Sequence, residues 1–415
     1  MRWVDPEAVA VALARRHSRM FWLDGAGARE WSGRCSVVGW LEESDRSIVH
    51  SATASASTDA FEAVQTALGA AASHERFVGW FGYAARPDLP ARRESTGTVP
   101  DSCWLHAKRY LVFDPARRIV TPVGFDTEPE LPVDPVDEPT TPGHSRVVST
   151  WTESDYAPAF AEVQRQLRLG NTYEVNLTYR HVVASDDDPI DVYRRLRRLN
   201  PAPYTAYVQH EGVAVLSSSP ERFCRIEGPA IETRPIKGTL PRGDDPIADA
   251  EYAQRLARDP KLRAENLIVT DLLRNDLSIV CRPGTVEVPE LMRVESYENV
   301  HQLVTTVHGR LRDGVGPVEA IRALMPGGSM TGAPKLRTMQ IIADVEDSPR
   351  GVYSGVLGWI GPRAADLGMV IRALVHDGEH YTAGTGGGVT VRSDEAEEYA
   401  ESRLKLDRVL AALGV

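Results

Sequence analysis

Short apolar runs separated by turn residues are the main pattern of the first 125 residues. The runs 20–23 and 110–113 end at Asp-Gly and Asp-Pro, and the run 77–83 carries two glycines among aromatic residues. Short apolar runs bounded by turn signals are typical of β-strands, whereas the segment 60–72 predicts a helix. The pattern therefore predicts a mixed α and β unit over residues 1–127.

Prolines and acidic residues fill the segment that follows. Between Glu128 and Pro142 there are five of each, with only three aliphatic side chains. This composition cannot bury an apolar surface and is typical of a solvated linker or long loop. We therefore place a linker at residues 128–148 and expect a second unit over 149–415.

The second unit alternates helical and strand patterns. Ser154 and Gly170 can begin and end its first helix, and glycines 386–388 are expected in a short loop. Further helices are expected at 192–199, 261–274, 318–325 and 393–413, and strands at 173–178, 205–209, 213–217, 231–236, within 286–308, and at 353–360 and 369–375.

One lysine in this unit has a sequence context that allows chemistry. Lys237 follows the predicted strand 231–236 and precedes Gly238, so it lies where the chain bends. Burial there would favour the neutral amine, which is the nucleophilic form of lysine. A surface lysine at the end of a strand is the simpler interpretation of this window by itself.

Three acidic residues on two predicted helices can hold a hard cation. Glu265 lies on the apolar face of helix 261–274, and Glu398 and Glu401 share a face of the last helix with Lys405. Mg²⁺ prefers carboxylate oxygens, and no His or Cys spacing favours a softer metal. Structural ion pairing and complementation of the helix dipole are the alternatives for these acids.

Several groups in the same unit are suited to an anionic ligand. The guanidinium of Arg372, the ammonium of Lys405 and the backbone N–H groups of glycines 386–388 can each bind an anion, although glycines are as common in plain hairpins. Glu221 offers an acid or base, and Lys237 offers a nucleophile. With Mg²⁺, these residues indicate a small polyanionic substrate and covalent or acid–base chemistry.

Composition narrows the class of protein. Of the 415 residues, 42% are hydrophobic and 25% are charged, as in soluble globular proteins, and the net charge is −11. A charge of that sign disfavours nucleic acid and anionic membranes as partners. The four cysteines form no CxxC pair, Met1–Asp5 does not open a signal peptide, and no apolar run reaches membrane length. We therefore expect a cytoplasmic protein.

Eight motifs occur in order along residues 170–410. They are SPERF (219–223), TRPIKGTLPRG (233–243), RAENLIVTDLLRND (263–276), PGGSMTGAPK (326–335), YSG (353–355), MVIRA (369–373), GTGGGV (384–389) and EEYAESRLK (397–405). With them the chain resembles the chorismate-utilising enzymes, most closely the aminodeoxychorismate synthase branch. The resemblance implies an α+β fold, a four-layer α/β/β/α sandwich of two largely antiparallel sheets flanked by helices.

The resemblance also implies roles for individual residues. Lys237 matches the lysine that attacks C2 of chorismate, and Glu221 matches the acid that protonates the departing C4 hydroxyl. Glu265 and Glu401 match the ligands of Mg²⁺, with Glu398 close to them. The matches to substrate-binding residues are Tyr353, Arg372, Gly386, Gly387, Gly388, Lys405, Ser329 and Thr239.

The match is incomplete at a few positions. Isochorismate and salicylate synthases carry a lysine at position 174 that activates water, and the aminodeoxychorismate branch usually carries glutamine, whereas this chain has Glu174. Gln302 stands where many relatives have histidine, and the adjacent His301 is expected on the opposite strand face. Residues 200–204 match one half of the tryptophan pocket of the relatives, and residues 23–25 match the other half poorly.

The implied reaction is the amination of chorismate at C4, which gives 4-amino-4-deoxychorismate. Anthranilate synthases carry alanine at the position of Lys237, so anthranilate synthase component I is the nearest alternative, and a non-catalytic chorismate- or tryptophan-binding regulator is another. No cysteine has the context of a glutaminase nucleophile. Ammonia is therefore expected from solution or from a separate glutamine amidotransferase subunit.

Overall fold

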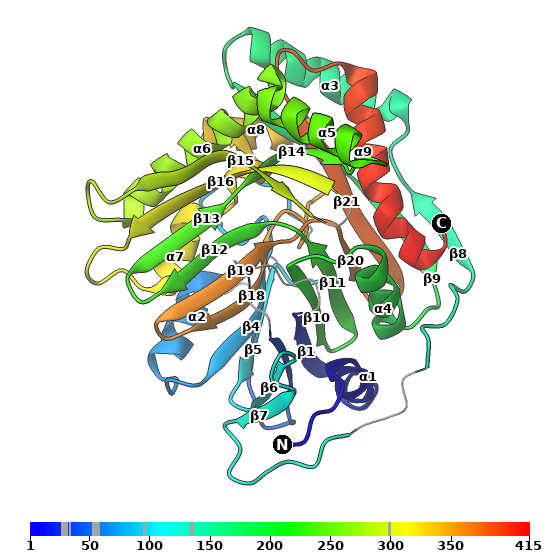
Figure 1. Ribbon diagram of the computed structural model, residues 1–415, viewed down its shortest axis with the longest axis vertical. Helices are drawn as coiled ribbons and strands as arrows, with labels where there is room; N and C mark the ends of the chain where they lie inside the picture. Colours follow the sequence, from blue (N-terminus) through cyan, green and yellow to red (C-terminus); the bar gives the residue numbers. More distant parts are fainter. Residues whose placement is uncertain (26–31, 33–34, 52–58, 94–96, 133–136, 298–299) are drawn as a thin grey trace.

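The computed structural model describes residues 1–25, 32, 35–51, 59–93, 97–132, 137–297 and 300–415. In these residues the chain forms two β-sheets, and the strands of both sheets pair in the antiparallel sense throughout. Helices cover the outer faces of the two sheets (Figure 1).

The larger sheet has eleven strands among the described residues, in the order β17-β9-β21-β20-β11-β10-β1-β2-β6-β7, with β8 beside β9. Its strands are β1 (Arg19–Asp24), β2 (Ser36–Trp40), β6 (Tyr110–Asp114), β7 (Ile119–Val123), β8 (Ser145–Ser149), β9 (Glu174–Ser185), β10 (Tyr204–His210), β11 (Val213–Ser219), β17 (Gly332–Ala333), β20 (Ala373–His376) and β21 (His380–Val389).

The smaller sheet has ten strands among the described residues, in the order β14-β16-β13-β12-β19-β18-β4-β5-β3, with β15 beside β16. Its strands are β3 (Ser47–His50), β4 (Arg76–Phe81), β5 (Ser102–Ala107), β12 (Arg222–Glu227), β13 (Ala230–Arg234), β14 (Ile236–Pro241), β15 (Glu287–Ser296), β16 (Val300–Arg310), β18 (Val356–Gly361) and β19 (Ala364–Met369).

The helices divide between the two sheets. On the side of the larger sheet lie α1 (Pro6–Arg16), α3 (Glu153–Arg168), α4 (Pro189–Leu199), α8 (Lys335–Val345) and α9 (Glu395–Leu410). On the side of the smaller sheet lie α2 (Ala60–Gly69), α5 (Pro246–Arg258), α6 (Pro260–Val280) and α7 (Pro317–Leu324), and short 3₁₀ turns occur at Gly328–Met330 and Ala411–Leu413.

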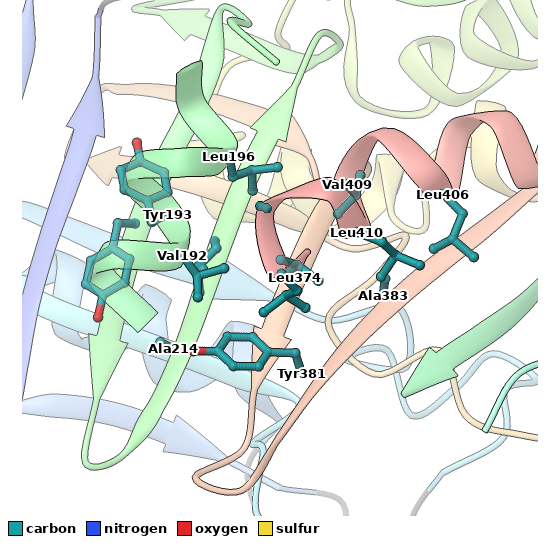
Figure 2. Close-up of a cluster of buried hydrophobic side chains, with 14 of the residues drawn as sticks. Val192, Tyr193, Leu196, Ala214, Leu374, Tyr381, Ala383, Leu406, Val409 and Leu410 are labelled. Atoms are coloured by element: carbon teal, nitrogen blue, oxygen red, sulfur yellow. The ribbon is translucent and has the colours of Figure 1, made fainter. Parts of the chain in front are cut away.

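Three apolar clusters hold the layers together. One lies between the sheets, where Trp80 of β4 and Val215 of β11 are fully buried. A second packs the helices of the smaller sheet against its outer face. The third packs α4 and α9 against the larger sheet, and Leu196, Leu374 and Leu410 belong to it (Figure 2). The clusters confirm the expected four-layer α/β/β/α sandwich, because each sheet buries both of its faces.

The first 127 residues contribute strands to both sheets. β1 pairs with β10 in the larger sheet, and β4 pairs with β18 in the smaller sheet. The described residues between Val123 and Ser145 form no helix or strand, whereas β8 (Ser145–Ser149) begins inside the segment 128–148 that was predicted to be a linker, and residues 133–136 lie outside the described residues. The linker therefore divides the chain but not the sheets.

Capping residues explain where the helices begin. Asp59, Asp188, Asp259 and Asp394 each accept a hydrogen bond from a backbone N–H of the first turn of α2, α4, α6 and α9. The first helix after the linker begins at Glu153 rather than at the expected Ser154, because Thr152 and Asp155 form a capping box.

Three strand predictions were wrong in detail. Glycines 386–388 lie within β21 and pair with residues 176–178 of β9, so they do not form a loop. Tyr353 lies in a turn before β18 rather than in the strand. Arg372 lies between β19 and β20, because the chain leaves the smaller sheet at Met369 and enters the larger one at Ala373. Among the described residues, no helix has the length and hydrophobicity that a membrane-spanning segment requires.

Candidate active site

The site lies where an edge strand of the smaller sheet faces the larger sheet. Pro235 interrupts the predicted strand 231–236, so that Lys237 lies inside β14 rather than after a strand. Its ammonium group forms a hydrogen-bonded ion pair with Glu174, the first residue of β9 in the larger sheet. The Lys237 side chain is 11% exposed and that of Glu174 is 1% exposed. Lys237 is therefore a buried residue held between the two sheets and not a surface lysine.

The glycines of β21 leave room for this ion pair. A Cβ at Gly388 would lie 2.5 Å from Oε1 of Glu174 and 2.9 Å from Nζ of Lys237, and a Cβ at Gly387 would lie 3.1 Å from Oε2 of Glu398. Distances below 3 Å cannot be kept without movement of the neighbouring groups. A Cβ at position 388 would therefore force the ends of the Glu174 and Lys237 side chains to shift from their present positions.

The charge state of Lys237 differs from the expectation. Burial lowers the pKa of this amine, but the carboxylates of Glu174 and Glu265 raise it by more. Glu221 adds a smaller effect in the same direction, so the pKa of Lys237 lies above its ordinary value. The expectation that burial would make the amine neutral was wrong, because desolvation is outweighed by the surrounding carboxylates.

Glu221 has the properties of a proton donor. It lies between β11 of the larger sheet and β12 of the smaller sheet, where the chain passes from one sheet to the other. Burial raises the pKa of its carboxyl to about 7, against the opposing effect of a 2.7 Å hydrogen bond from Oγ of Ser329. A carboxyl with a pKa near neutrality can carry a proton to a leaving group and return to the anion afterwards.

Glu265 is the second buried carboxyl of the site. It projects from α6 with Oε1 buried and without a hydrogen-bond partner in the described residues. Burial raises its pKa to about 7, while Lys237 opposes the rise and Glu174 adds to it. An unpartnered buried carboxylate oxygen is costly, so this position calls for a cation or a ligand.

The two acids of α9 are paired with lysines. Glu398 is buried, and its Oε1 accepts a 2.9 Å hydrogen bond from Nζ of Lys261 on α6. Glu401 is exposed and pairs with Lys405 at 2.8 Å, and this pairing lowers the pKa of the Glu401 carboxyl. Nζ of Lys405 also donates to the backbone oxygen of Gly386, at 3.2 Å. These lysines neutralise the acids that were expected to bind metal.

The carboxylates fit a hard cation in their chemistry, although they are not gathered into a ready-made cluster. Within the described ranges, no three His, Cys, Asp or Glu side chains lie close enough together to hold a metal ion. However, Mg²⁺ needs only one or two carboxylates when waters and a substrate supply the other ligands. The unpartnered oxygen of Glu265 and the buried carboxylate of Glu398 meet that requirement.

A cavity of about 310 Å³ opens beside these strands. It is lined by Pro220, which precedes Glu221, and by Gln302, which faces Thr239 in the pairing of β14 with β16. Its other lining residues include Asn200, Pro203, Arg372 and Arg408. The segment 200–203 therefore lines the same cavity as Arg372.

Two arginines make this cavity attractive to anions. The backbone of Arg372 has φ +49°, so it departs from the extended geometry of the strands before and after it. Burial lowers the pKa of its guanidinium, and Arg408 lowers it further. In the part of the chain that the structure describes, neither guanidinium has an acidic partner. Because two like charges repel, a bound carboxylate would be stabilised by both.

Tyr353 and Thr239, which were also expected to bind substrate, do not line this cavity. Tyr353 is buried, with the guanidinium of Arg180 4.9 Å from its ring centroid, and the absence of a side chain at Gly384 accommodates the ring. Thr239 is exposed on β14. His301 binds Asp249 and Ser296, so it faces away from the cavity that Gln302 lines.

Three residues of the site had no assigned role in the sequence analysis. They are Lys261, Arg408 and, as the partner of Lys237, Glu174. Lys261 begins the helix of the RAENLIVTDLLRND motif and could have been found from its spacing of four residues to Glu265, which puts both on one helix face. No local signal relates Glu174 to Lys237, because they are 63 residues apart and on different sheets.

Comparison with known proteins identifies relatives over most of the chain. It is 42% identical to an aminodeoxychorismate synthase of Streptomyces pristinaespiralis, over 81% of this chain and 50% of the relative. It is 38% identical to aminodeoxychorismate synthase component 1 of Klebsiella aerogenes, over 81% of this chain and 76% of the relative. Anthranilate synthase component 1 of Streptomyces coelicolor is 34% identical, over 82% of this chain and 73% of the relative. The chain thus spans half the length of the first of these relatives.

A solved structure shares the fold. Anthranilate synthase component I of Streptococcus pneumoniae superimposes with a TM-score of 0.77 at 20% identity, covering 93% of each chain. The family model described as "chorismate binding enzyme" matches residues 18–411, which include both sheets and every residue of the site. The chain therefore belongs to the chorismate binding enzyme family.

Proposed function

We propose that this chain is the chorismate-aminating component of an aminodeoxychorismate synthase, which converts chorismate and ammonia into 4-amino-4-deoxychorismate. The observation that carries the proposal is Lys237, a lone buried amine among the carboxylates of Glu174, Glu221 and Glu265. The names of the relatives from Streptomyces pristinaespiralis and Klebsiella aerogenes support it.

The substrate is a dicarboxylate, and the site offers two places for its charges. Arg372 and Arg408 in the cavity suit one carboxylate. Glu265 and Glu398 would hold Mg²⁺ near the other, where the ion would orient the ring and offset its charge. The residues of the chain then perform the bond-making steps.

Glu221 and Lys237 divide the chemistry between them. The amine of Lys237 attacks C2, the ring double bond shifts, and the C4–O bond breaks as Glu221 donates its proton, so that water leaves. Ammonia then attacks C4 and displaces the lysine from C2, and the new ammonium group returns a proton to Glu221. Hydroxide is a poor leaving group, so a donor with a pKa of about 7 beside C4 lowers the barrier.

A partner protein would supply the ammonia. Two of the relatives are named as component 1 of a synthase, which implies a second component. We propose that a glutamine amidotransferase subunit hydrolyses glutamine beside this chain, and that high concentrations of an ammonium salt replace it in vitro.

Product analysis tests the proposed function directly. The purified chain is incubated with chorismate, MgCl₂ and ammonium chloride, and the products are identified by mass spectrometry while pyruvate is measured in parallel. We expect 4-amino-4-deoxychorismate without pyruvate. Anthranilate with an equal amount of pyruvate would identify an anthranilate synthase instead, and bound but unchanged chorismate would identify a regulator.

The variant Lys237→Ala is the matched control. Without ammonia, the wild-type chain should gain the mass of chorismate minus water, since the lysine adduct cannot be released. Lys237→Ala should gain nothing. Repeated failure of the wild type to form the adduct would remove the covalent step from the mechanism.

A further inference from the structure

We propose that Glu174 is the proton acceptor of Lys237, so that the nucleophile is charged in the empty site and becomes neutral by transfer of its proton within the ion pair. The inference rests on the proposed function, because it concerns the same lysine. It assigns a role to a residue for which glutamine is the usual counterpart in the aminodeoxychorismate branch.

The geometry of the ion pair carries the inference. Nζ of Lys237 donates directly to Oε1 of Glu174, and Oε2 of Glu174 is buried without a hydrogen-bond partner in the described residues. A proton transferred along this contact would lie on Oε1, and the loss of the negative charge would lower the cost of keeping Oε2 buried without a partner. Direct contact also means that the proton can move without an intervening water.

The other carboxyls near Lys237 are less suited to this task. Glu221 is engaged by Ser329 and donates its own proton to the leaving group. Glu265 projects from α6 and acts on Lys237 through its charge rather than through a hydrogen bond. Glu174 is therefore the carboxylate in hydrogen-bond contact with the reacting nitrogen.

A purely structural role explains the pair less well. A buried ion pair contributes little net stability, because desolvation of both charges offsets their attraction. The absence of a side chain at Gly388 nevertheless leaves the room in which the pair forms, because a Cβ there would lie 2.5 Å from Oε1 of Glu174 and 2.9 Å from Nζ of Lys237 and the ends of both side chains would have to shift. The site thus preserves a contact of small energetic value next to the reacting centre, which is the pattern of a functional contact.

The proposed step balances. The ammonium of Lys237 gives one proton to the carboxylate of Glu174, which leaves a neutral amine and a neutral acid. The amine forms the C2–N bond as the C4 hydroxyl leaves with the proton of Glu221. When ammonia later displaces the lysine from C2, the free amine recovers its proton from Glu174. No redox change and no further reactant is required.

The test compares the wild type with Glu174→Gln, which keeps the size and the acceptor oxygen but cannot take a proton. Adduct formation is timed by rapid quench and intact mass, with chorismate and MgCl₂ but without ammonia, between pH 6 and 9. For the wild type we expect a rate that falls above about pH 7, as Glu221 loses the proton it donates, but that does not fall on the acid side, because proton transfer from Lys237 is internal. For Glu174→Gln we expect roughly 10²-fold slower adduct formation at pH 7, and the ratio of its rate to that of the wild type should rise with pH, because the proton of Lys237 must leave to solvent. A rate at pH 7 equal to or faster than that of the wild type would overturn the inference.

A second measurement does not depend on turnover. The chain has only five lysines, at 108, 237, 261, 335 and 405, so ¹³C labelling at lysine Cε gives few signals, and Lys237→Met assigns the one of interest. We expect the Lys237 signal to titrate at lower pH in Glu174→Gln, where Glu221 and Glu265 are the remaining acids around the amine. Asp276→Asn, which breaks the buried 2.7 Å pair with Lys335, is the control and should shift only Lys335.

The two measurements separate the inference from the proposed function. An unchanged Lys237 signal in Glu174→Gln overturns the inference whatever the substrate is. A shifted signal together with no adduct in the wild type counts against the proposed function and against proton transfer as a catalytic step.

Discussion

Lys261 of α6 and Glu398 of α9 join the two helices that border the site, through an ion pair of 2.9 Å. The Glu398 side chain is buried, so its charge must be balanced whether or not a metal is bound. Without a divalent cation, Lys261 supplies that balance. If the proposed Mg²⁺ binds Glu398, the lysine and the metal would compete for the same carboxylate.

This competition predicts the behaviour of Lys261→Met. The variant should bind Mg²⁺ several-fold more tightly, because the carboxylate of Glu398 is no longer engaged, and it should melt at a lower temperature than the wild type when no metal is present. Calorimetric titration with MgCl₂ and thermal unfolding with and without MgCl₂ measure both effects. Lys108→Met, which removes an exposed lysine, is the control and should change neither. A lower Mg²⁺ affinity in Lys261→Met would show that the lysine assists the metal instead.

Ser329 is expected to set the working pH through Glu221. Its hydrogen bond stabilises the carboxylate form of Glu221, whose pKa is about 7 because of burial. Ser329→Ala removes that hydrogen bond, so the pKa should rise and the loss of kcat/KM on the alkaline side should move to higher pH. The pH profile of kcat/KM measures the shift. Ser329→Thr keeps a hydroxyl, so the alkaline side of its pH profile should match that of the wild type. If the alkaline side does not move in Ser329→Ala, then Glu221 does not determine it.

Local sequence signals predicted the parts of the site that lie on helices. Apolar periodicity placed Glu265 on the inner face of α6, and the structure buries it there. The spacing of Glu398 and Glu401 also placed both residues on one face of the last helix. Their burial differs, however, because Glu398 faces α6 and Glu401 faces solvent. Periodicity describes a face of a helix but not how far the next element covers it.

The parts that the sequence could not predict depend on contacts between the sheets. The apolar run 369–375 is continuous in sequence, but the chain changes sheets at Arg372, so a single strand was expected where two occur. Lys237 has Glu174 as its partner because edge strand β14 meets the start of β9, and strand order is not encoded locally. The charge of Lys237 was misjudged for the same reason, since its carboxylate neighbours come from three separate elements.

Glu221 is expected to lower the stability of the protein above neutral pH. Its pKa is raised from 4.5 in the unfolded chain to about 7 in the folded chain, so the folded state holds a proton that the unfolded state has lost between these values. Stability therefore falls as the pH rises from 4.5 to 7, by about 3 kcal/mol at most. Glu221→Gln removes this penalty and should be inactive but more stable than the wild type at pH 8.

Chemical denaturation at pH 4 and pH 8 measures this trade-off. At pH 4 both proteins carry a neutral side chain at position 221 in both states, so their free energies of unfolding should be close. Equal stabilities at pH 8 as well would mean that other groups stabilise the carboxylate of Glu221 in the folded state. Its role as the proton donor would then require another cause of the raised pKa.

Gly388 provides the sharpest steric test of the site. In Gly388→Ala the new Cβ would lie 2.5 Å from Oε1 of Glu174 and 2.9 Å from Nζ of Lys237, so the ends of both side chains must shift and the amine is displaced. We expect loss of adduct formation by about 10²-fold or more, because a small displacement of a nucleophile is enough for such a loss. Gly69→Ala is the matched control: its Cβ would meet nothing within 4 Å, activity should be unchanged, and stability should gain only slightly because Gly69 is the last residue of α2. Full activity in Gly388→Ala would mean that the Lys237–Glu174 contact is dispensable, and the positioning of the nucleophile would have to be assigned to Glu265 and Glu221 alone.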